Sequence, residues 1–186
     1  MRLFIALTAL LVLTPTPSHA EDQAPPNAPP QWFTENVTFM TSGSGRWVAD
    51  NGGYKSDQES WDAYGLEWVA GPGGYSMSGH LFGIKDGEDT DEDFWTFSQY
   101  WDPTTNRAVV QQYGWGSIGT GTMWTVGDDL WMQQTFSTFD AESSEEGHLA
   151  THPDANSHVT SSYSIDATGQ WSKNRTYTWV RDVADD

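Results

Sequence analysis

The chain has 186 residues, with 26 acidic and 8 basic side chains, a formal net charge of −18 and no cysteine. A chain this acidic should not bind nucleic acid, whose phosphates need a basic surface. The lack of cysteine excludes disulfides, thiol chemistry, iron–sulfur clusters and cysteine zinc sites.

The first twenty residues are typical of a secretion signal. Arg2 precedes a mostly apolar run from Leu3 to Leu13, which is too short to span a bilayer as a helix. Prolines end the run, and Ser18-His19-Ala20 is a small-x-small cleavage site. We expect cleavage near Ala20 and a mature protein in the bacterial periplasm or outside the cell. No later segment is long and apolar enough to span a membrane.

After the signal, the sequence predicts a Pro-rich linker and lead-in over residues 21–42, one domain over 43–181 and an acidic tail over 182–186. Gln31 to Met40 is compatible with a short helix or an opening strand. Nine later segments show the two-residue alternation of β-strands, separated by Gly, Pro, Asn and Asp turns. They are Arg46–Asp50, Asp57–Val69, Gly74–Ile84, Asp93–Asp102, Arg107–Gly116, Gly119–Val126, Leu130–Phe139, Ser157–Ile165 and Gln170–Arg181.

Two acidic segments, residues 86–93 and 140–156, are predicted to be solvated loops. The first has alternating carboxylates, as calcium loops do, but lacks the glycine and the distal glutamate of an EF-hand. The second carries histidines beside acids, an incomplete pattern for zinc or copper. Neither pattern is complete enough to assign a metal ligand, so we predict no metal ligands and no cofactor. Whether either loop binds a metal is left open. The side chains concerned are Asp89, Asp91, Asp93, His148, His152 and His158.

Aromatic residues dominate the predicted strands. The chain has 11 Trp, 7 Tyr and 8 Phe, and most of them lie in the alternating segments. So many short strands must close or stack to hide their edges. The sequence therefore predicts an all-β fold, an antiparallel up-and-down β-barrel of about eight to ten strands.

Alternation also sorts side chains by face. Gln and Arg recur among the rings on the apolar face, and a buried polar group without a partner costs about 1–3 kcal/mol. These side chains either bond one another, or orient a molecule bound in an aromatic cavity, or reflect a parity slip at a bulge. The predicted ligand-binding residues are Trp95, Phe97, Gln99, Gln111, Tyr113, Gln134, Tyr163, Arg175 and Tyr177.

Gly45-Arg46-Trp47 opens the first clear strand, and Arg175 and Arg181 lie in the last one. A Gly-x-Trp whose indole is covered by a basic residue of the last strand resembles the calycins, which include the lipocalins, over roughly Gly43 to Val180. With the turn Tyr100-Trp101-Asp102-Pro103, the chain also resembles exported bacterial lipocalin-like proteins of unknown function. The resemblance implies a barrel holding one small ligand, with Gly45, Trp47 and Arg175 as its structural signature.

Three functions follow as hypotheses. The first is an exported barrel that binds a small apolar or aromatic molecule. The second is a carbohydrate-binding β-sandwich that uses surface Trp. The third is an enzyme on a calycin-like barrel, in which Asp62 or Glu67 points inward and shares a pocket with Arg175. No catalytic residue is predicted from a motif, and the oligomeric state is left open.

Overall fold

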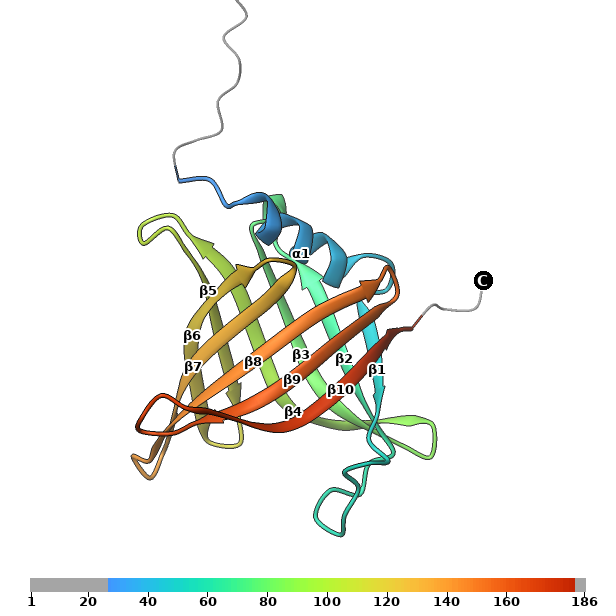
Figure 1. Cartoon of the computed structure of the whole chain (residues 1–186). Helices are drawn as coiled ribbons and strands as arrows, with labels where there is room; N and C mark the ends of the chain where they lie inside the picture. Colours follow the sequence, from blue (N-terminus) through green and yellow to red (C-terminus); the bar gives the residue numbers. More distant parts are fainter. Residues whose placement is uncertain (1–26, 183–186) are drawn as a thin grey trace, which may run out of the picture.

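The computed structural model describes residues 27–182, in which one α-helix precedes a closed barrel of ten antiparallel strands (Figure 1). The predicted fold class is confirmed. Each strand pairs with its neighbours in the chain, and β1 pairs with β10 to close the ring. The predicted signal and cleavage site, and the last four residues of the acidic tail, lie outside the described residues. The elements are α1 (Gln31–Thr41), β1 (Arg46–Asp50), β2 (Ala63–Ala70), the 3-10 turn η1 (Pro72–Gly74), β3 (Ser76–Lys85), β4 (Glu88–Asp102), β5 (Arg107–Gly114), β6 (Ser117–Val126), β7 (Asp129–Thr138), β8 (Ser143–Asp154), β9 (Ser157–Ile165) and β10 (Trp171–Arg181).

The two acidic segments predicted to be loops are mostly strand. β8 covers Ser143–Asp154, and β4 begins at Glu88. Their backbones pair with the neighbouring strands, while carboxylates and hydroxyls on both faces hide the apolar alternation that marks a half-buried strand. The opposite error occurs at Asp57, because β2 begins only at Ala63.

Residues 51–62 form a loop that continues the barrel wall beyond the end of β1. β1 pairs with only three residues of β10, from Trp179 to Arg181. Further along β10, the hydroxyl of Tyr54 accepts a hydrogen bond from the Thr176 amide at 2.9 Å. The guanidinium of Arg175 lies 5.1 Å from the centre of the Tyr54 ring. The loop therefore covers a strand edge that β1 leaves unpaired.

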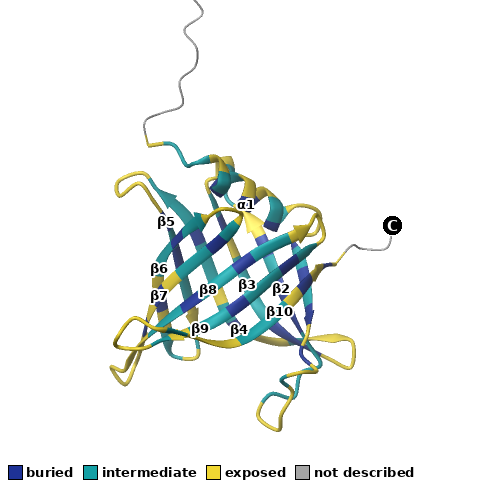
Figure 2. Ribbon diagram, in the orientation of Figure 1, coloured by how far each residue is buried: buried dark blue, intermediate teal, exposed yellow. Residues whose placement is uncertain are grey.

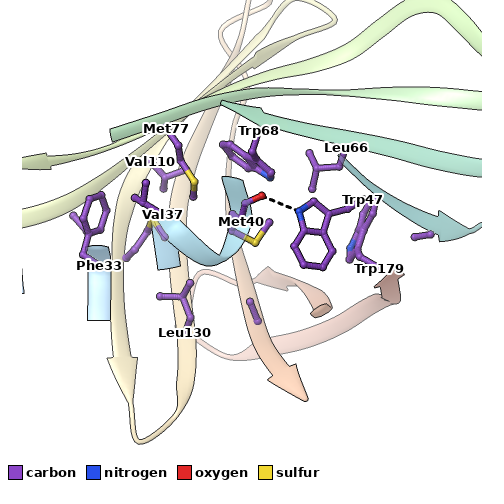
Figure 3. Packing of buried hydrophobic residues seen from close by; sticks show 14 of the residues in the cluster. Phe33, Val37, Met40, Trp47, Leu66, Trp68, Met77, Val110, Leu130 and Trp179 are labelled. Atoms are coloured by element: carbon purple, nitrogen blue, oxygen red, sulfur yellow. Dashed lines mark hydrogen bonds between the residues drawn. The ribbon is translucent and has the colours of Figure 1, made fainter. Parts of the chain in front are cut away.

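Helix α1 closes one end of the barrel, as Figure 1 shows. Phe33, Val37 and Met40 recur on one helical face and are at most 3% exposed. Figure 3 shows them among Met77 and Val110 of the barrel wall. The segment that the sequence left open between helix and strand is thus a helix with a buried apolar stripe. Within residues 27–182, no helix is long and apolar enough to cross a bilayer.

Burial alternates along the strands (Figure 2), and Trp47 and Ala49 of β1 are almost fully buried. The Trp47 indole donates a hydrogen bond to the Met40 carbonyl at 3.0 Å, which ties β1 to the end of α1 (Figure 3). Gly45 has φ +68°, and a Cβ there would lie 2.2 Å from the carbonyl oxygen of Trp68. Only glycine fits this position. The barrel is consistent with a calycin-like fold.

Arg181, and not Arg175, covers Trp47. Its guanidinium lies 4.1 Å from the indole centre and donates hydrogen bonds to the carbonyls of Ser42, Phe39 and Ala155. The strand register explains why Arg181 covers the indole and Arg175 does not, since Trp47 lies opposite Arg181. Arg175 lies six residues earlier along β10, roughly 20 Å away at about 3.3 Å per residue. The predicted signature of Gly45, Trp47 and Arg175 is wrong in its third member.

We expect Arg181→Ala to lower the free energy of unfolding by at least about 2 kcal/mol, because it removes the cation–π contact and leaves half-buried carbonyls without donors. Chemical denaturation followed by Trp fluorescence measures this. Arg107→Ala, at an exposed position on β5, should change stability by less than about 0.5 kcal/mol. Equal effects of the two substitutions would contradict the role given to Arg181.

Candidate functional site

The barrel encloses a cavity of about 900 Å³. The cavity extends from Asn36 and Met40 of α1 to residues of the loop 51–62 at the other end of the barrel. Its volume and mainly apolar wall fit a small organic ligand. The aromatic side chains that line it are Trp61, Tyr64, Trp68, Phe94, Trp95, Phe97, Trp115, Phe136, Tyr177 and Trp179.

The wall can be this aromatic and still leave a hollow because the rings lie over glycines of neighbouring strands. A Cβ added at Gly79 would lie 2.8 Å from the ring of Trp68, so the indole occupies the space of the missing side chain. These rings belong to residues that line the cavity. The pairs are Trp61 with Gly83, Trp68 with Gly79, Trp95 with Gly114 and Phe136 with Gly119.

Six of the nine predicted ligand-binding residues line this cavity. Two of them, Gln99 and Gln134, are only 5% and 1% exposed. The strand alternation that placed them inside is therefore correct for β4 and β7. Whether these side chains bind a ligand stays a prediction. The six are Trp95, Phe97, Gln99, Gln134, Arg175 and Tyr177.

Gln111 and Tyr113 of β5 are not among the lining residues. Val110 and Gln112 line the cavity instead, and the Tyr113 hydroxyl donates to Gln111 at 2.9 Å. The inward parity of β5 is thus opposite to the predicted one. The apolar pair Val109–Val110 puts a similar residue on each face, so alternation alone does not distinguish the two faces.

Tyr163 of β9 also lies away from the cavity. It packs against Trp131 and Trp171, with ring centres 6.5 and 5.6 Å apart. The inward residues of β9 are His158, Thr160 and Ser162, so the inner face of this strand is polar and Tyr163 lies on the outer face. A register shift between Lys173 and Arg175 changes the parity along β10, so Trp171 does not line the cavity although Arg175 does.

A polar network lies at the cavity end opposite α1. Arg175 donates to Glu59 at 2.6 Å and to the Tyr177 hydroxyl at 3.3 Å. Tyr177 in turn donates to Asn51 at 3.0 Å, and Tyr64 donates to Glu59. The hydrogen bond from Arg175 holds the pKa of the Glu59 carboxyl below its usual value, so the pair is an ion pair. No sequence pattern marks Glu59, because its contact with β10 spans 116 residues.

The acids considered for catalysis do not line the cavity. Asp62 accepts hydrogen bonds from Lys55 and from the Asp86 amide, and Glu67 accepts one from Arg46 at 2.8 Å. The condition set by the enzyme hypothesis, that one of them shares a pocket with Arg175, is therefore not met. Besides Glu59, the lining carboxylate is Glu146, and burial raises the pKa of that carboxyl.

Trp115 combines backbone strain with exposure at the same end of the cavity. It has φ 53° in the two-residue turn between β5 and β6 and is 69% exposed, yet it lines the cavity. The left-handed conformation costs a bulky L-residue about 1–2 kcal/mol. Phe94 lies 6.2 Å away, ring centre to ring centre. A large indole kept in a strained conformation at a cavity mouth is a candidate ligand contact.

We predict that Trp115→Asn raises the free energy of unfolding by about 1 kcal/mol, because Asn tolerates this conformation. The same substitution should weaken binding of an apolar probe, since the ring at the mouth is lost. Thermal unfolding and probe titration on the same sample measure the two effects. Weaker stability together with unchanged probe affinity would contradict the role given to Trp115.

His148 and His158 line the cavity, and His152 stacks on Phe39 of α1 with ring centres 4.0 Å apart. Burial lowers the pKa of His148 to about 4 and that of His158 to about 3, so both are neutral at pH 7. Within residues 27–182, no group of three or more His, Asp or Glu is arranged to hold a metal ion. Of the alternating carboxylates, Asp89 pairs with Arg46 and Asp93 lies 2.7 Å from His80.

The buried histidines predict a loss of stability in acid. The unfolded chain takes up protons near the ordinary pKa of 6.5, whereas the folded chain takes them up only near pH 4 and 3. Each of the two histidines should therefore lower the free energy of unfolding by about 1.4 kcal/mol per pH unit as pH falls from 6.5 toward 4. The double variant His148→Gln, His158→Gln should flatten this dependence in urea unfolding at a series of pH values.

His80 supplies a control of opposite sign. Burial lowers the pKa of His80, but hydrogen bonds with Asp93 and Glu67 outweigh it and leave the pKa raised. Protonated His80 therefore stabilises the fold fully below pH 6.5, and this contribution is lost as the pH rises through the raised pKa. We expect His80→Gln to abolish a gain in stability as the pH falls to 6.5, and to leave the slope of the acid loss just below pH 6.5 unchanged. The explanation fails if His80→Gln flattens that acid loss as the double variant does.

The chain matches no family model and no curated protein. The closed antiparallel barrel and the arginine-covered Gly-x-Trp are consistent with a calycin-like fold.

Proposed function

We propose that this protein binds a small, largely apolar or aromatic molecule inside its barrel. The observation that carries the proposal is the cavity of about 900 Å³, whose wall consists mainly of rings and aliphatic side chains. Burying such a molecule against this wall removes apolar surface from water, at about 25 cal/mol per Å². Helix α1 covers one end, so the ligand would enter from the end that carries Trp115.

The charged groups of the wall support binding rather than acid–base catalysis. Arg175 and Glu59 neutralise each other in an ion pair at 2.6 Å. Glu146 has no second lining carboxylate free of such a pair, as a two-carboxylate mechanism requires. The site thus offers shape and apolar surface, and its charged side chains are few.

The structure gives the carbohydrate hypothesis little support. The strands form one closed barrel and not a sandwich. Of the eleven tryptophans, all within the described residues, only Trp115 is exposed. A flat sugar-stacking surface needs several solvent-facing rings in one plane. The other ten indoles are buried or half-buried.

We also propose that the mature protein is exported, on the basis of the apolar run, the small-x-small site near Ala20 and the acidic, cysteine-free composition. N-terminal sequencing of protein from the periplasm or medium of an expressing bacterium tests this. A protein that stays in the cytoplasm with its first twenty residues intact would refute it.

A cavity-filling variant tests binding. Ser162 lies on the inner face of β9, and Ser162→Phe should weaken binding of the neutral probe N-phenyl-1-naphthylamine by about tenfold or more, because the new ring occupies ligand space. The probe's fluorescence increase on entering an apolar site gives the affinity. Ser137→Phe adds the same ring at an exposed position on β7 and should leave the affinity unchanged. Equal affinities in both variants, or no binding by the parent protein, would refute the proposal.

A further inference from the structure

The cavity wall holds most of the buried polar atoms that have no hydrogen-bond partner among the described residues. Eight side chains have such an atom, and five of the eight line the cavity. Buried polar atoms are normally paired, so an unpaired group needs an explanation. The five atoms are Nε1 of Trp68, Oε1 of Gln99, Nε2 of Gln134, Nδ1 of His148 and Nδ1 of His158.

These atoms come from two opposite walls. Trp68 on β2 and Gln99 on β4 flank β3, whereas the other three belong to β7, β8 and β9. In a ring of ten strands, β3 and β8 are five strands apart and face each other across the hollow. On the second wall, Gln134 pairs with Glu146 and Met132 with His148, so Gln134 and His148 are diagonal neighbours on one face.

The five unpaired atoms include both hydrogen-bond donors and hydrogen-bond acceptors. The Trp68 indole and the Gln134 amide offer N–H groups, whereas the Gln99 carbonyl oxygen accepts. A neutral imidazole nitrogen can do either, depending on its tautomer. A hydroxyl group both donates and accepts, so it satisfies every member of this set. A carbonyl or an ether would satisfy only the donors.

The charges of the wall disfavour an anion. The ionisable side chains of the wall apart from the two histidines and the tyrosines are Arg175, Glu59 and Glu146, and Glu59 already neutralises Arg175. Glu146 lies directly opposite Gln134 on the neighbouring strand. A ligand carboxylate docked there would therefore meet a second carboxyl group and no free cation. A neutral hydroxylated molecule meets neither problem.

We propose that the ligand is a neutral ring compound that carries hydroxyl groups on opposite sides of an apolar frame, and that Trp68 and Gln99 on one wall and Gln134, His148 and His158 on the other recognise those groups. The proposal rests on the proposed function, since it names the ligand class for the same cavity. The apolar frame would pack on the rings, and the hydroxyl groups would satisfy polar atoms that are otherwise buried unpaired.

Four matched compounds test this by isothermal titration of the mature protein: naphthalene, 2-naphthol, 2,6-dihydroxynaphthalene and 2-naphthoate. We expect the dihydroxy compound to bind at least about tenfold more tightly than naphthalene, 2-naphthol to lie between them, and 2-naphthoate to bind no better than naphthalene. Equal affinities for naphthalene and both hydroxylated compounds, or tightest binding of naphthoate, would overturn the inference. If none of the four binds, the proposed function itself fails.

A pair of variants tests whether the polar residues of the cavity wall cause the preference for hydroxylated compounds. Gln134→Leu should reduce the gain from hydroxylation to about threefold or less, leave naphthalene affinity within about twofold, and raise the melting temperature of the free protein because an unpaired buried amide is removed. Gln133→Leu, at the next position but exposed, should keep the full gain. Gln99→Leu makes the same test on the opposite wall if Gln134→Leu does not fold. A preference that survives both inner substitutions would overturn the inference.

Discussion

The placement of large rings over glycines of neighbouring strands is the constraint on which the rest of this structure depends. Small barrels with inward side chains of ordinary size fill their own interior. Here the ring of Trp68 occupies the space above Gly79, and that of Phe136 the space above Gly119. Apolar surface is therefore buried along the wall while the axis stays open. Three of the eleven tryptophans, Trp61, Trp68 and Trp95, lie over glycines of the cavity wall in this way.

The two ends of the barrel differ in physical character. At the α1 end, Arg181 stacks on Trp47 and donates to carbonyls after the helix and in the β8–β9 turn, so these backbone groups are satisfied. At the other end, the loop 51–62 brings Glu59 to Arg175, and charged groups meet solvent. Buried, neutral His158 lies toward the first end, which fits its lowered pKa.

The sequence predicted the fold well because a closed sheet repeats a simple pattern. Seven of the nine predicted strands keep their bounds to within two residues, and the second and fourth differ mainly at their starts. β8 was missed because Ser144, Glu146 and His148 face the cavity, so polarity on the inner wall removed the signal that alternation needs. The missed strand and the polar part of the cavity wall therefore have the same cause.

The parts of the site that the sequence did not predict arise from contacts that are distant along the chain. Alternation can place Gln134 inside, yet it says nothing of Glu59, which reaches β10 from a loop. It also cannot detect a register shift, and the shift next to Arg175 turns Trp171 away from the face that Arg175 occupies. Strand alternation alone therefore predicts which strands form the cavity wall. The strand register and the loop contacts determine which polar side chains that wall carries.

Several local rules are broken in this protein where the cavity lies. Trp115 holds a left-handed conformation at the mouth, and the amides of Gln99 and Gln134 each leave a polar atom unpaired in the wall. Each departure costs free energy in the protein alone, and neither is needed to close the barrel, which depends on the Trp47 end and the strand register. Violations gathered on one surface are typical of a binding site, because a ligand that meets them recovers free energy that the empty fold gives up.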